Sequence, residues 1–325
     1  MYSKKVVTLI LGLLLLLFAV NKADAVGNFY YNGMESWNAN SAYKKAQKIN
    51  NKDIIMKRYD YAHKNKYKAV GRVSNMDGWK GPGKDSMGTG FVVGNHTFVT
   101  NAHVVERANG RQTDPKNIKF QLNRDGKKIP YQFQVQKIYK VPAYDIVVVE
   151  TKENMVQKAN VKPFKLATNQ QIKSLKFNDN LYSLGYPVIN GDNTYAYWHK
   201  LKFLQEASNK AELMTKDIFR AGDSGFPMVN SNFEVYALRT YGYNLRGNSG
   251  YQYAKQEVAG GESIYGNPRA FILRHIRSNI QTERPSIIER CSVCFKCRII
   301  CHVGCKSYKL TMLIHESNII KEEYE

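Results

Sequence analysis

The stretch Gly88–Val105, which reads GTGFVVGNHTFVTNAHVV, decides the fold of this chain. Two short apolar runs, Gly90–Val93 and Thr97–Val99, stand on either side of a Gly-Asn turn. Apolar runs of this length around a glycine-containing turn are typical of an antiparallel β-hairpin. His103 follows the second run closely, so we expect a strand, a turn and a second strand that delivers a histidine near its end.

Two segments farther along the chain give this histidine a chemical role. Tyr144–Val149 reads YDIVVV and places Asp145 directly before an apolar strand. Gly222–Pro227 reads GDSGFP and places Ser224 between two glycines of a tight turn. The order His, Asp, Ser resembles that of chymotrypsin-like proteases, whereas subtilisins and α/β-hydrolases use other orders. The gaps are long enough to place the histidine and the aspartate in one β-barrel and the serine in a second.

These residue types have a defined division of labour in peptide-bond hydrolysis. A serine hydroxyl is a poor nucleophile until a base removes its proton, and the imidazole of His103 is available as that base at neutral pH. Asp145 would hold one ring N–H and stabilise the imidazolium that forms. The backbone N–H groups of Gly222 and Ser224 would form the oxyanion hole. We therefore expect a triad of His103, Asp145 and Ser224 that uses no metal and no other cofactor.

The body of the chain, from about Tyr67 to residue 282, is typical of an all-β protein. Its apolar runs are short, often alternate with polar residues and are separated by Gly-Asn, Asp-Gly and Gly-Asp turns, as in antiparallel barrels or sandwiches. With the triad order, this pattern predicts a chymotrypsin-like double antiparallel β-barrel over residues 67–282 and an active site between the barrels. Near its end, Asn267-Pro268 opens a predicted helix whose apolar face would pack against the second barrel. That face comprises Phe271, Ile272, His275, Ile276 and Ile280.

The segment before the body, residues 26–66, is polar and rich in Asn, Lys and Tyr. We interpret it as a charged helical arm; the alternative is a removable pro-segment. The apolar residues that recur at loosely helical spacing are Ala42, Ala46, Ile49, Ile54 and Ile55.

The first residues have the features of a secretion signal. Lys4 and Lys5 precede an apolar run from Val6 to Val20, and small residues stand at Ala23 and Ala25. We expect cleavage after Ala25 and a secreted, extracellular protein; an uncleaved membrane anchor is the alternative.

All five cysteines lie in the last part of the chain, residues 283–325, which does not resemble the body. Four of them have the C-x₂-C-x₂-C-x₃-C spacing of iron–sulfur ligands, and Cys305 and His302 add zinc-ligand types. We interpret this tail as foreign to the domain, for example the product of a frameshift or read-through; metal binding and disulfide formation are the alternatives. The four spaced cysteines are Cys291, Cys294, Cys297 and Cys301.

The chain carries a formal net charge of +21, spread over many lysines without a recognised nucleic-acid-binding module. A field of this sign favours anionic partners such as cell-wall polymers or cell surfaces. The alternative is a solvated basic surface with no specific partner. We expect a protein or peptide substrate, no nucleic-acid partner and a monomer.

Several motifs together resemble the staphylococcal glutamyl endopeptidase and exfoliative toxin family. The arm running into the body is most similar to the exfoliative toxins. The resemblance covers roughly residues 38–281 and implies a secreted, cysteine-free double β-barrel that cleaves peptide bonds, usually after glutamate, with His103, Asp145 and Ser224 as its triad. The motifs are Gly88–Asn95, Thr100–Val105, Leu184–Pro187, Ile276–Ile280 and Lys66–Gly71.

The chain departs from that family around the nucleophile and in the specificity pocket. Asp223 replaces the usual Asn, as in the trypsins, and needs a partner such as Arg220, or else stays partly exposed; Phe226 adds bulk where Ser is common. The positions of the family's pocket Thr and His are held by Phe219 and Arg239. Arg239 could receive a substrate carboxylate, fill the pocket or turn to solvent.

The sequence therefore predicts a secreted serine endopeptidase with a toxin-like extracellular role, acting after acidic residues if Arg239 lines the pocket. The competing hypothesis is a catalytically impaired protease-fold binding protein or adhesin.

Overall fold

The computed structural model of the chain describes residues 29–60, 66–244 and 257–283. The predicted signal peptide, residues 1–25, and the cysteine-rich tail lie outside the described residues. Within the described ranges, no helix is long and apolar enough to cross a membrane.

Six antiparallel strands close the first barrel in the order β2-β3-β4-β7-β6-β5. The predicted hairpin is confirmed, since β3 and β4 pair with Phe91 opposite Val99. Large apolar side chains fill this barrel, and the rings of Phe98 and Phe120 stack with centroids 4.1 Å apart. The strands are β2 (Val70–Asn75), β3 (Ser86–Val92), β4 (Thr97–Thr100), β5 (Ile118–Leu122), β6 (Tyr131–Lys140) and β7 (Val147–Thr151).

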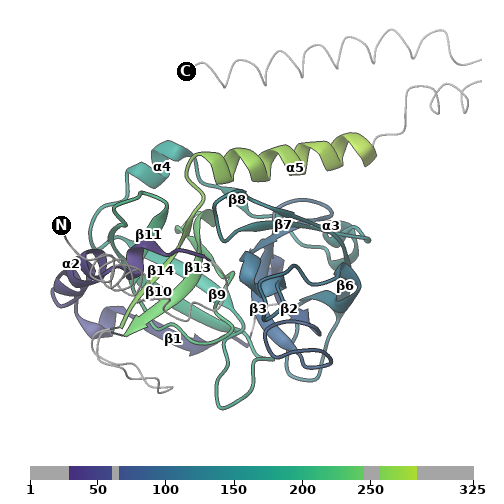
Figure 1. Ribbon diagram of the computed structural model, residues 1–325, viewed down its shortest axis with the longest axis horizontal. Helices are drawn as coiled ribbons and strands as arrows, with labels where there is room; N and C mark the ends of the chain where they lie inside the picture. Colours follow the sequence, from purple (N-terminus) through teal and green to yellow (C-terminus); the bar gives the residue numbers. More distant parts are fainter. Residues whose placement is uncertain (1–28, 61–65, 245–256, 284–325) are drawn as a thin grey trace, which may run out of the picture. The chain divides into compact units, whose positions relative to one another are not determined.

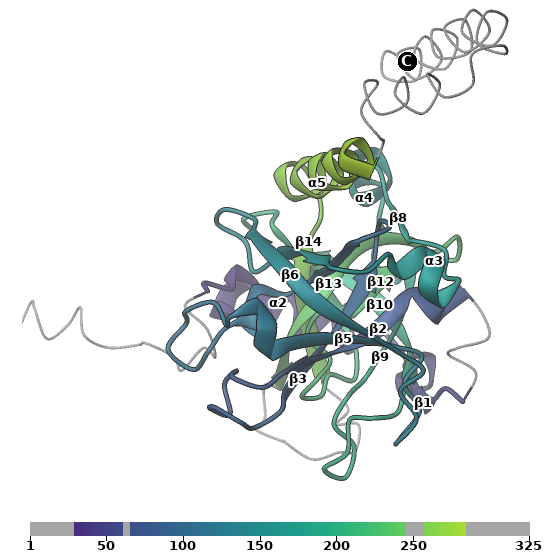
Figure 2. The same cartoon turned by 90° about the vertical axis from the view of Figure 1, so that its right-hand side faces the viewer.

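The second barrel closes in the order β9-β10-β11-β14-β13-β12, because β9 pairs with both β10 and β12. Figure 1 shows the two barrels side by side, Figure 2 views them from the side of the first barrel, and contacts described below join them. The expected double antiparallel β-barrel is thus the fold of the chain. The strands are β9 (Asn180–Gly185), β10 (Tyr197–Glu206), β11 (Glu212–Lys216), β12 (Pro227–Val229), β13 (Glu234–Asn244) and β14 (Glu257–Ser263); β8 (Lys165–Leu166) pairs in parallel with β13.

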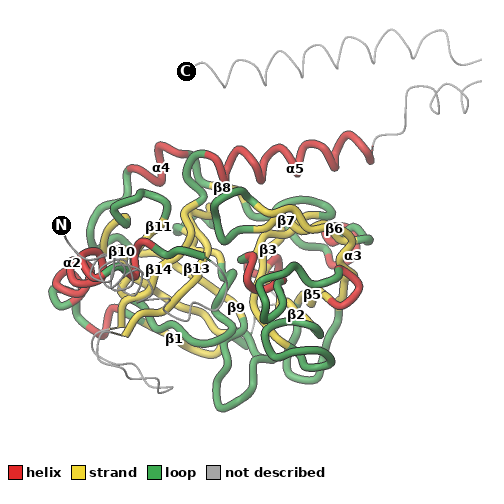
Figure 3. The backbone as a smooth tube through the Cα atoms, in the orientation of Figure 1, coloured by secondary structure: helices red, strands yellow, loops and turns green. Residues whose placement is uncertain are grey.

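Helices are few and lie outside the strands (Figure 3). The predicted C-terminal helix is present as α5, Asn267–Glu283, with Ile272 fully buried; the side chain of Ile280 lies outside the described residues. Two short helices, α3 (Met155–Ala159) and α4 (Asn169–Lys173), stand between the barrels in sequence. Short 3₁₀ turns lie at Asn32–Met34, Asn51–Asp53, Lys66–Ala69, Ala102–Val105 and Pro115–Asn117.

The arm is helical over α2, Ser36–Ala46. The helical prediction is wrong for Ile54 and Ile55: Ile54 has extended backbone, and Ile55 begins strand β1 (Ile55–Arg58), which pairs with β10. The helix ends where the Lys216 ammonium donates to the carbonyls of Ala46 and Ile49 at 2.9 and 2.5 Å. A cation that binds carbonyls at the end of a helix stabilises its C-terminus. The arm therefore joins the second barrel through a strand and a helix.

Candidate active site

The three predicted triad residues come from loops where the barrels meet. His103 lies in the turn Ala102–Val105 that follows β4, and Asp145 lies directly before β7. Ser224 lies in the loop before β12 of the second barrel, and its carbonyl accepts a hydrogen bond of 2.9 Å from the N–H of Thr89 in β3. This contact holds the serine loop against the first barrel.

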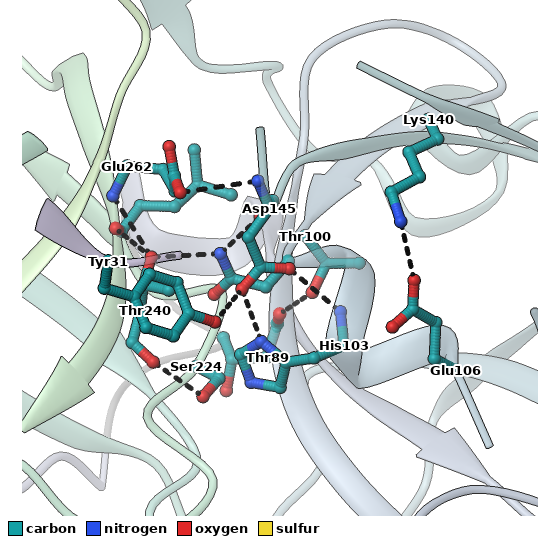
Figure 4. Close-up of polar contacts among 12 residues, drawn as sticks. Tyr31, Thr89, Thr100, His103, Glu106, Lys140, Asp145, Ser224, Thr240 and Glu262 are labelled. Atoms are coloured by element: carbon teal, nitrogen blue, oxygen red, sulfur yellow. Dashed lines mark hydrogen bonds and ion pairs between the residues drawn. The ribbon is translucent and has the colours of Figure 1, made fainter. Parts of the chain in front are cut away.

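Asp145 is fully buried and binds His103 twice (Figure 4). Its Oδ2 lies 2.6 Å from the ring Nδ1, and its Oδ1 accepts the backbone N–H of His103 at 2.9 Å. The Asn101 side chain donates to the Asp145 carbonyl at 2.7 Å and to the Thr240 hydroxyl at 3.0 Å. The aspartate is thereby fixed from both barrels, in the position that orients an imidazole for general-base catalysis.

The electrostatics around His103 favour its protonated form. Burial by itself would lower its pKa, but the charge and hydrogen bond of Asp145, with a smaller contribution from Glu106, outweigh burial and raise the pKa above 6.5. A base whose pKa lies near the working pH can accept a proton and return it within one reaction cycle.

The loop that carries Ser224 has the backbone shape needed to bind an oxyanion. Gly222 and Gly225 have φ angles of +90° and +88°, which side chains rarely adopt. A Cβ on Gly222 would stand 2.5 Å from the Tyr186 carbonyl. The Ala221 carbonyl accepts from the Val188 N–H at 2.7 Å. Among the contacts of the described residues, the N–H groups of Gly222 and Ser224 have no acceptor, so both can donate to substrate.

Arg239 is fully buried behind this loop, so the solvent-facing alternative is wrong. Its guanidinium lies 2.8 Å from the Asp217 carboxylate and 3.1 Å from that of Asp223. Phe219 and Phe226 cover it, with ring centroids 5.3 and 5.1 Å from its central carbon.

Asp223 binds the expected Arg220 through a backbone N–H and has a second partner in Arg239. Its carboxylate accepts the backbone N–H of Arg220 at 2.7 Å, but the charge that faces it at ion-pair distance is the guanidinium of Arg239. It is fully buried, so the alternative of partial exposure is also wrong. Burial raises the pKa of Asp223 to about 7 and that of Asp217 to about 6, although Arg239 opposes both shifts.

His199 completes this buried cluster. The Arg239 guanidinium can only donate, so the His199 Nδ1 at 3.2 Å accepts and the ring is neutral. Burial, followed by the charges of Arg239 and Arg220, holds its pKa well below 6.5. The cluster of Arg239, Asp217, Asp223 and His199 thus neutralises most of its own charge.

Phe219 is half-buried against β13. A Cβ on Gly242 would lie 2.7 Å from the Cβ of Phe219. Arg239 thus fills space behind Phe219 and shows no exposed surface to a substrate in this structure.

Tyr31 of the arm is a member of the site that the sequence analysis did not single out. Its hydroxyl donates to Asp145 Oδ2 at 2.7 Å. The only signal available in the sequence was the abundance of tyrosine in the arm, which does not distinguish one tyrosine from another. No group of three or more His, Cys, Asp or Glu side chains in the described ranges is arranged to hold a metal ion.

Comparison with known proteins agrees with this geometry. Residues 88–238 match the family model of the trypsin-like peptidase domain. This part of the chain is thus similar to a trypsin-like peptidase domain. The chain is similar in structure to a Glu endopeptidase, with a TM-score of 0.54 and 15% identity over 68% of this chain and 96% of that one. It is also similar to an inactivated protease paralogue of the scabies mite, with a TM-score of 0.51 and 14% identity over 68% and 96% of the two chains.

At these identities the similar structures show the fold alone, and the family model adds a similarity to peptidase domains over residues 88–238. The match over residues 88–238 agrees with the serine protease class predicted from the order of His103, Asp145 and Ser224. Closeness to the exfoliative toxins and glutamate specificity stay predictions.

Proposed function

We propose that the protein is a serine endopeptidase that works through His103, Asp145 and Ser224 and an acyl-enzyme intermediate. The observation that carries the proposal is the partly exposed His103, bonded to the buried Asp145, beside a serine loop with two N–H groups available for an oxyanion. In the structure the Ser224 hydroxyl donates to the Thr240 carbonyl at 3.3 Å. This bond is long and weak, so the hydroxyl can leave it at little cost.

The reaction follows from these positions. Ser224 Oγ attacks the substrate carbonyl carbon as its proton passes to the free ring nitrogen of His103, Nε2. The oxyanion that forms accepts from the N–H groups of Gly222 and Ser224. The peptide C–N bond then breaks, the leaving amine takes the proton from His103, and the acyl group stays on Ser224. A water molecule attacks the ester, gives its proton to His103, and the released serine recovers that proton.

An acidic preference is the more specific part of the proposal, and it rests on the family resemblance and on the charge of Arg239. Two buried carboxylates already accompany this guanidinium, and Phe219 covers it. A substrate carboxylate would therefore reach Arg239 only after Phe219 moves. We further propose, from the N-terminal sequence, that the enzyme acts outside the cell, and from its positive charge that it associates with anionic surfaces. That it is a monomer also stays a proposal.

A catalytically impaired binding protein is the second candidate. The observations in its favour are the Ser224 hydroxyl bonded to Thr240 and the phenylalanine in front of Arg239. An impaired enzyme would keep the fold and lose the reactivity of the serine.

Covalent labelling separates the two candidates. A fluorophosphonate probe forms a bond to an activated serine and releases fluoride, so the wild-type protein should be labelled stoichiometrically and Ser224→Ala should not. The hydroxyl is the only group lost, so the melting temperature of that variant should not change, while peptide hydrolysis should fall by about 10⁴-fold or more. Wild-type protein that is not labelled would favour the binding protein.

Digestion of a mixed peptide library then tests the acidic preference. Cleavage after Glu and Asp that persists to alkaline pH would support a role for Arg239, because a guanidinium keeps its charge where an imidazole loses it. A profile dominated by apolar or small residues would show that Phe219 and Arg239 only fill the pocket.

A further inference from the structure

We propose that Tyr31, from the arm outside the two barrels, is a positioning residue of the active site that holds Asp145 and sets the basicity of His103. This inference rests on the proposed function, since it concerns the same triad. It assigns the arm a part in catalysis in place of a role as a dispensable extension.

The carboxylate of Asp145 receives three donors in a place that water does not reach. Oδ1 accepts the His103 backbone N–H at 2.9 Å. Oδ2 accepts the ring N–H of His103 and the Tyr31 hydroxyl, at 2.6 and 2.7 Å (Figure 4). Asp145 is fully buried, so no solvent can replace the hydroxyl if it is removed. A buried carboxylate that loses a donor is stabilised less, and more of its charge acts on the remaining partners.

The other hydroxyl near this point is already used. Thr240 donates to the Leu238 carbonyl at 3.0 Å and accepts from the Asn101 side chain and from the Glu262 backbone N–H. Tyr31 therefore supplies the side-chain hydroxyl bound to Asp145 in the described part of the chain.

The arm holds Tyr31 in place through a second buried carboxylate. The backbone N–H groups of Asn32 and Gly33 donate to the two oxygens of Glu212 at 2.7 and 2.9 Å. The Tyr241 hydroxyl donates to the same carboxylate at 2.6 Å, and its ring lies 5.0 Å from that of Tyr31. A Cβ on Gly33 would collide with the Tyr241 hydroxyl, so only glycine fits there. These contacts fix the backbone on the C-terminal side of Tyr31.

The charged groups around Asp145 in the described part of the chain are consistent with a donor role for Tyr31. Burial, followed by the charge of Asp145, raises the pKa of Tyr31, which stays protonated and donates at all working pH values. Burial and then Asp145 also raise the pKa of Glu262 well above its usual range, so this carboxyl is neutral where it accepts the Asp145 N–H at 3.4 Å. Glu212 lies beyond Tyr31, and Glu106 acts on His103 from the other side.

Tyr31→Phe tests the proposal, because it removes one oxygen and keeps the ring. With one donor fewer, Asp145 attracts the imidazolium proton more strongly, so the pKa of His103 should rise by roughly half a unit or more. The acidic limb of kcat/KM should move to higher pH by the same amount. Near pH 6.5 the activity should fall by about three- to tenfold, and at alkaline pH, where His103 is neutral in both proteins, the loss should be smaller.

Tyr30→Phe is the matched control, since Tyr30 is the adjacent residue and 66% exposed; it should leave the pH profile unchanged. An identical acidic limb for Tyr31→Phe and wild type would overturn the proposal, as would an activity loss that is equal at every pH. If Tyr31→Phe is too unstable to assay, Glu212→Gln provides a second test. It weakens the hydrogen bonds from Asn32 and Gly33 that hold the arm, and it should shift the pH profile of kcat/KM in the same direction.

Titration of His103 by NMR in the Ser224→Ala background provides a readout that does not need activity. The pKa of the imidazole should be higher with Tyr31→Phe than without it, and an unchanged value would contradict the inference. If the wild-type protein neither labels nor cleaves, the proposed function fails, while this titration still decides whether Tyr31 acts on His103.

Discussion

The two barrels share one topology and differ in what they bury. In the first barrel the interior is apolar. Apart from Asp145, its most deeply buried charged side chains are Arg72 and Glu106. They pair with the partly exposed Asp85 and Lys140 at the rim. In the second barrel Arg239, Asp217, Asp223 and His199 lie together with no exposed surface. A buried ion pair is weak evidence for stability, because desolvation offsets most of its attraction.

The difference shows that the buried charges lie next to the loop of the candidate active site. The buried charges of the second barrel lie behind the loop that carries Gly222 and Ser224. The backbone N–H of Gly225 donates to the Arg239 carbonyl at 2.9 Å, and that of Arg239 donates to the Phe226 carbonyl at 2.8 Å. Arg239 thus holds the serine loop with its backbone and, through Asp223, with its side chain. An apolar interior would support the fold but would leave this loop without that ion pair.

The largest effect should come from removing the charge that the second barrel buries. Arg239→Met leaves Asp217 and Asp223 without their guanidinium and should destabilise the protein by about 3–5 kcal/mol near pH 8. The loss should be smaller near pH 5, where both carboxyls are protonated. Urea denaturation at the two pH values measures this, with Lys140→Met as the rim control at less than about 1 kcal/mol. Equal losses for both variants would remove the contrast between the barrels.

Gly222→Ala should damage catalysis more than stability. The residue has a positive φ, and a Cβ would meet the Tyr186 carbonyl, so the oxyanion loop must shift. We expect kcat to fall about 10²–10³-fold, as for the loss of an oxyanion donor. Gly191→Ala is the matched control, since Gly191 has a φ of +81° and open space around it. Its kcat should be unchanged, and a comparable loss there would point to backbone strain in general.

Stability should fall as pH rises from about 4 to 7. The pKa values of Asp217 and Asp223 are raised from 3.8 to about 6 and 7, mainly by burial. The native state therefore holds more protons than the unfolded state in this window, and each carboxyl contributes a negative slope of at most about 1.4 kcal/mol per pH unit. Asp223→Asn removes one of these titrations and should flatten the curve of melting temperature against pH. An unchanged curve for that variant would show that the Asp223 carboxyl is ionised over this whole pH range.

The smallest effect should be a conservative change in the apolar first barrel. Phe98→Leu replaces one stacked ring and should cost about 1–1.5 kcal/mol, because the site can repack with a similar apolar residue. Its cost should not vary between pH 5 and 8, since no titratable group lies in that interior stack. Chemical denaturation at both pH values measures the cost. A pH-dependent cost would mean that the first barrel is coupled to charges elsewhere.

Local sequence patterns determined the outline of this protein. Short apolar runs and glycine turns predicted the β3–β4 hairpin, and a proline near the start of an amphipathic stretch predicted α5. The chain order of His103, Asp145 and Ser224 predicted the double barrel, because each residue stands in a short motif whose backbone requirements are local. Glycines on both sides of Ser224 likewise indicated the tight loop, since only glycine adopts its positive φ freely.

Only the tertiary structure decided the partners of the buried charges. Arg239 and Asp223 are neighbours because strand β13 passes behind the serine loop. Tyr31 reaches Asp145 because Glu212, more than a hundred positions later in the sequence, binds the backbone of the arm next to Tyr31. The helix of the arm ends at Ala46, and β1 begins at Ile55, because Lys216 and β10 offer bonds there. Such contacts depend on distances across the folded chain. A sequence pattern fixes periodicity and turns, while desolvation and hydrogen-bond geometry act only once the barrels have closed.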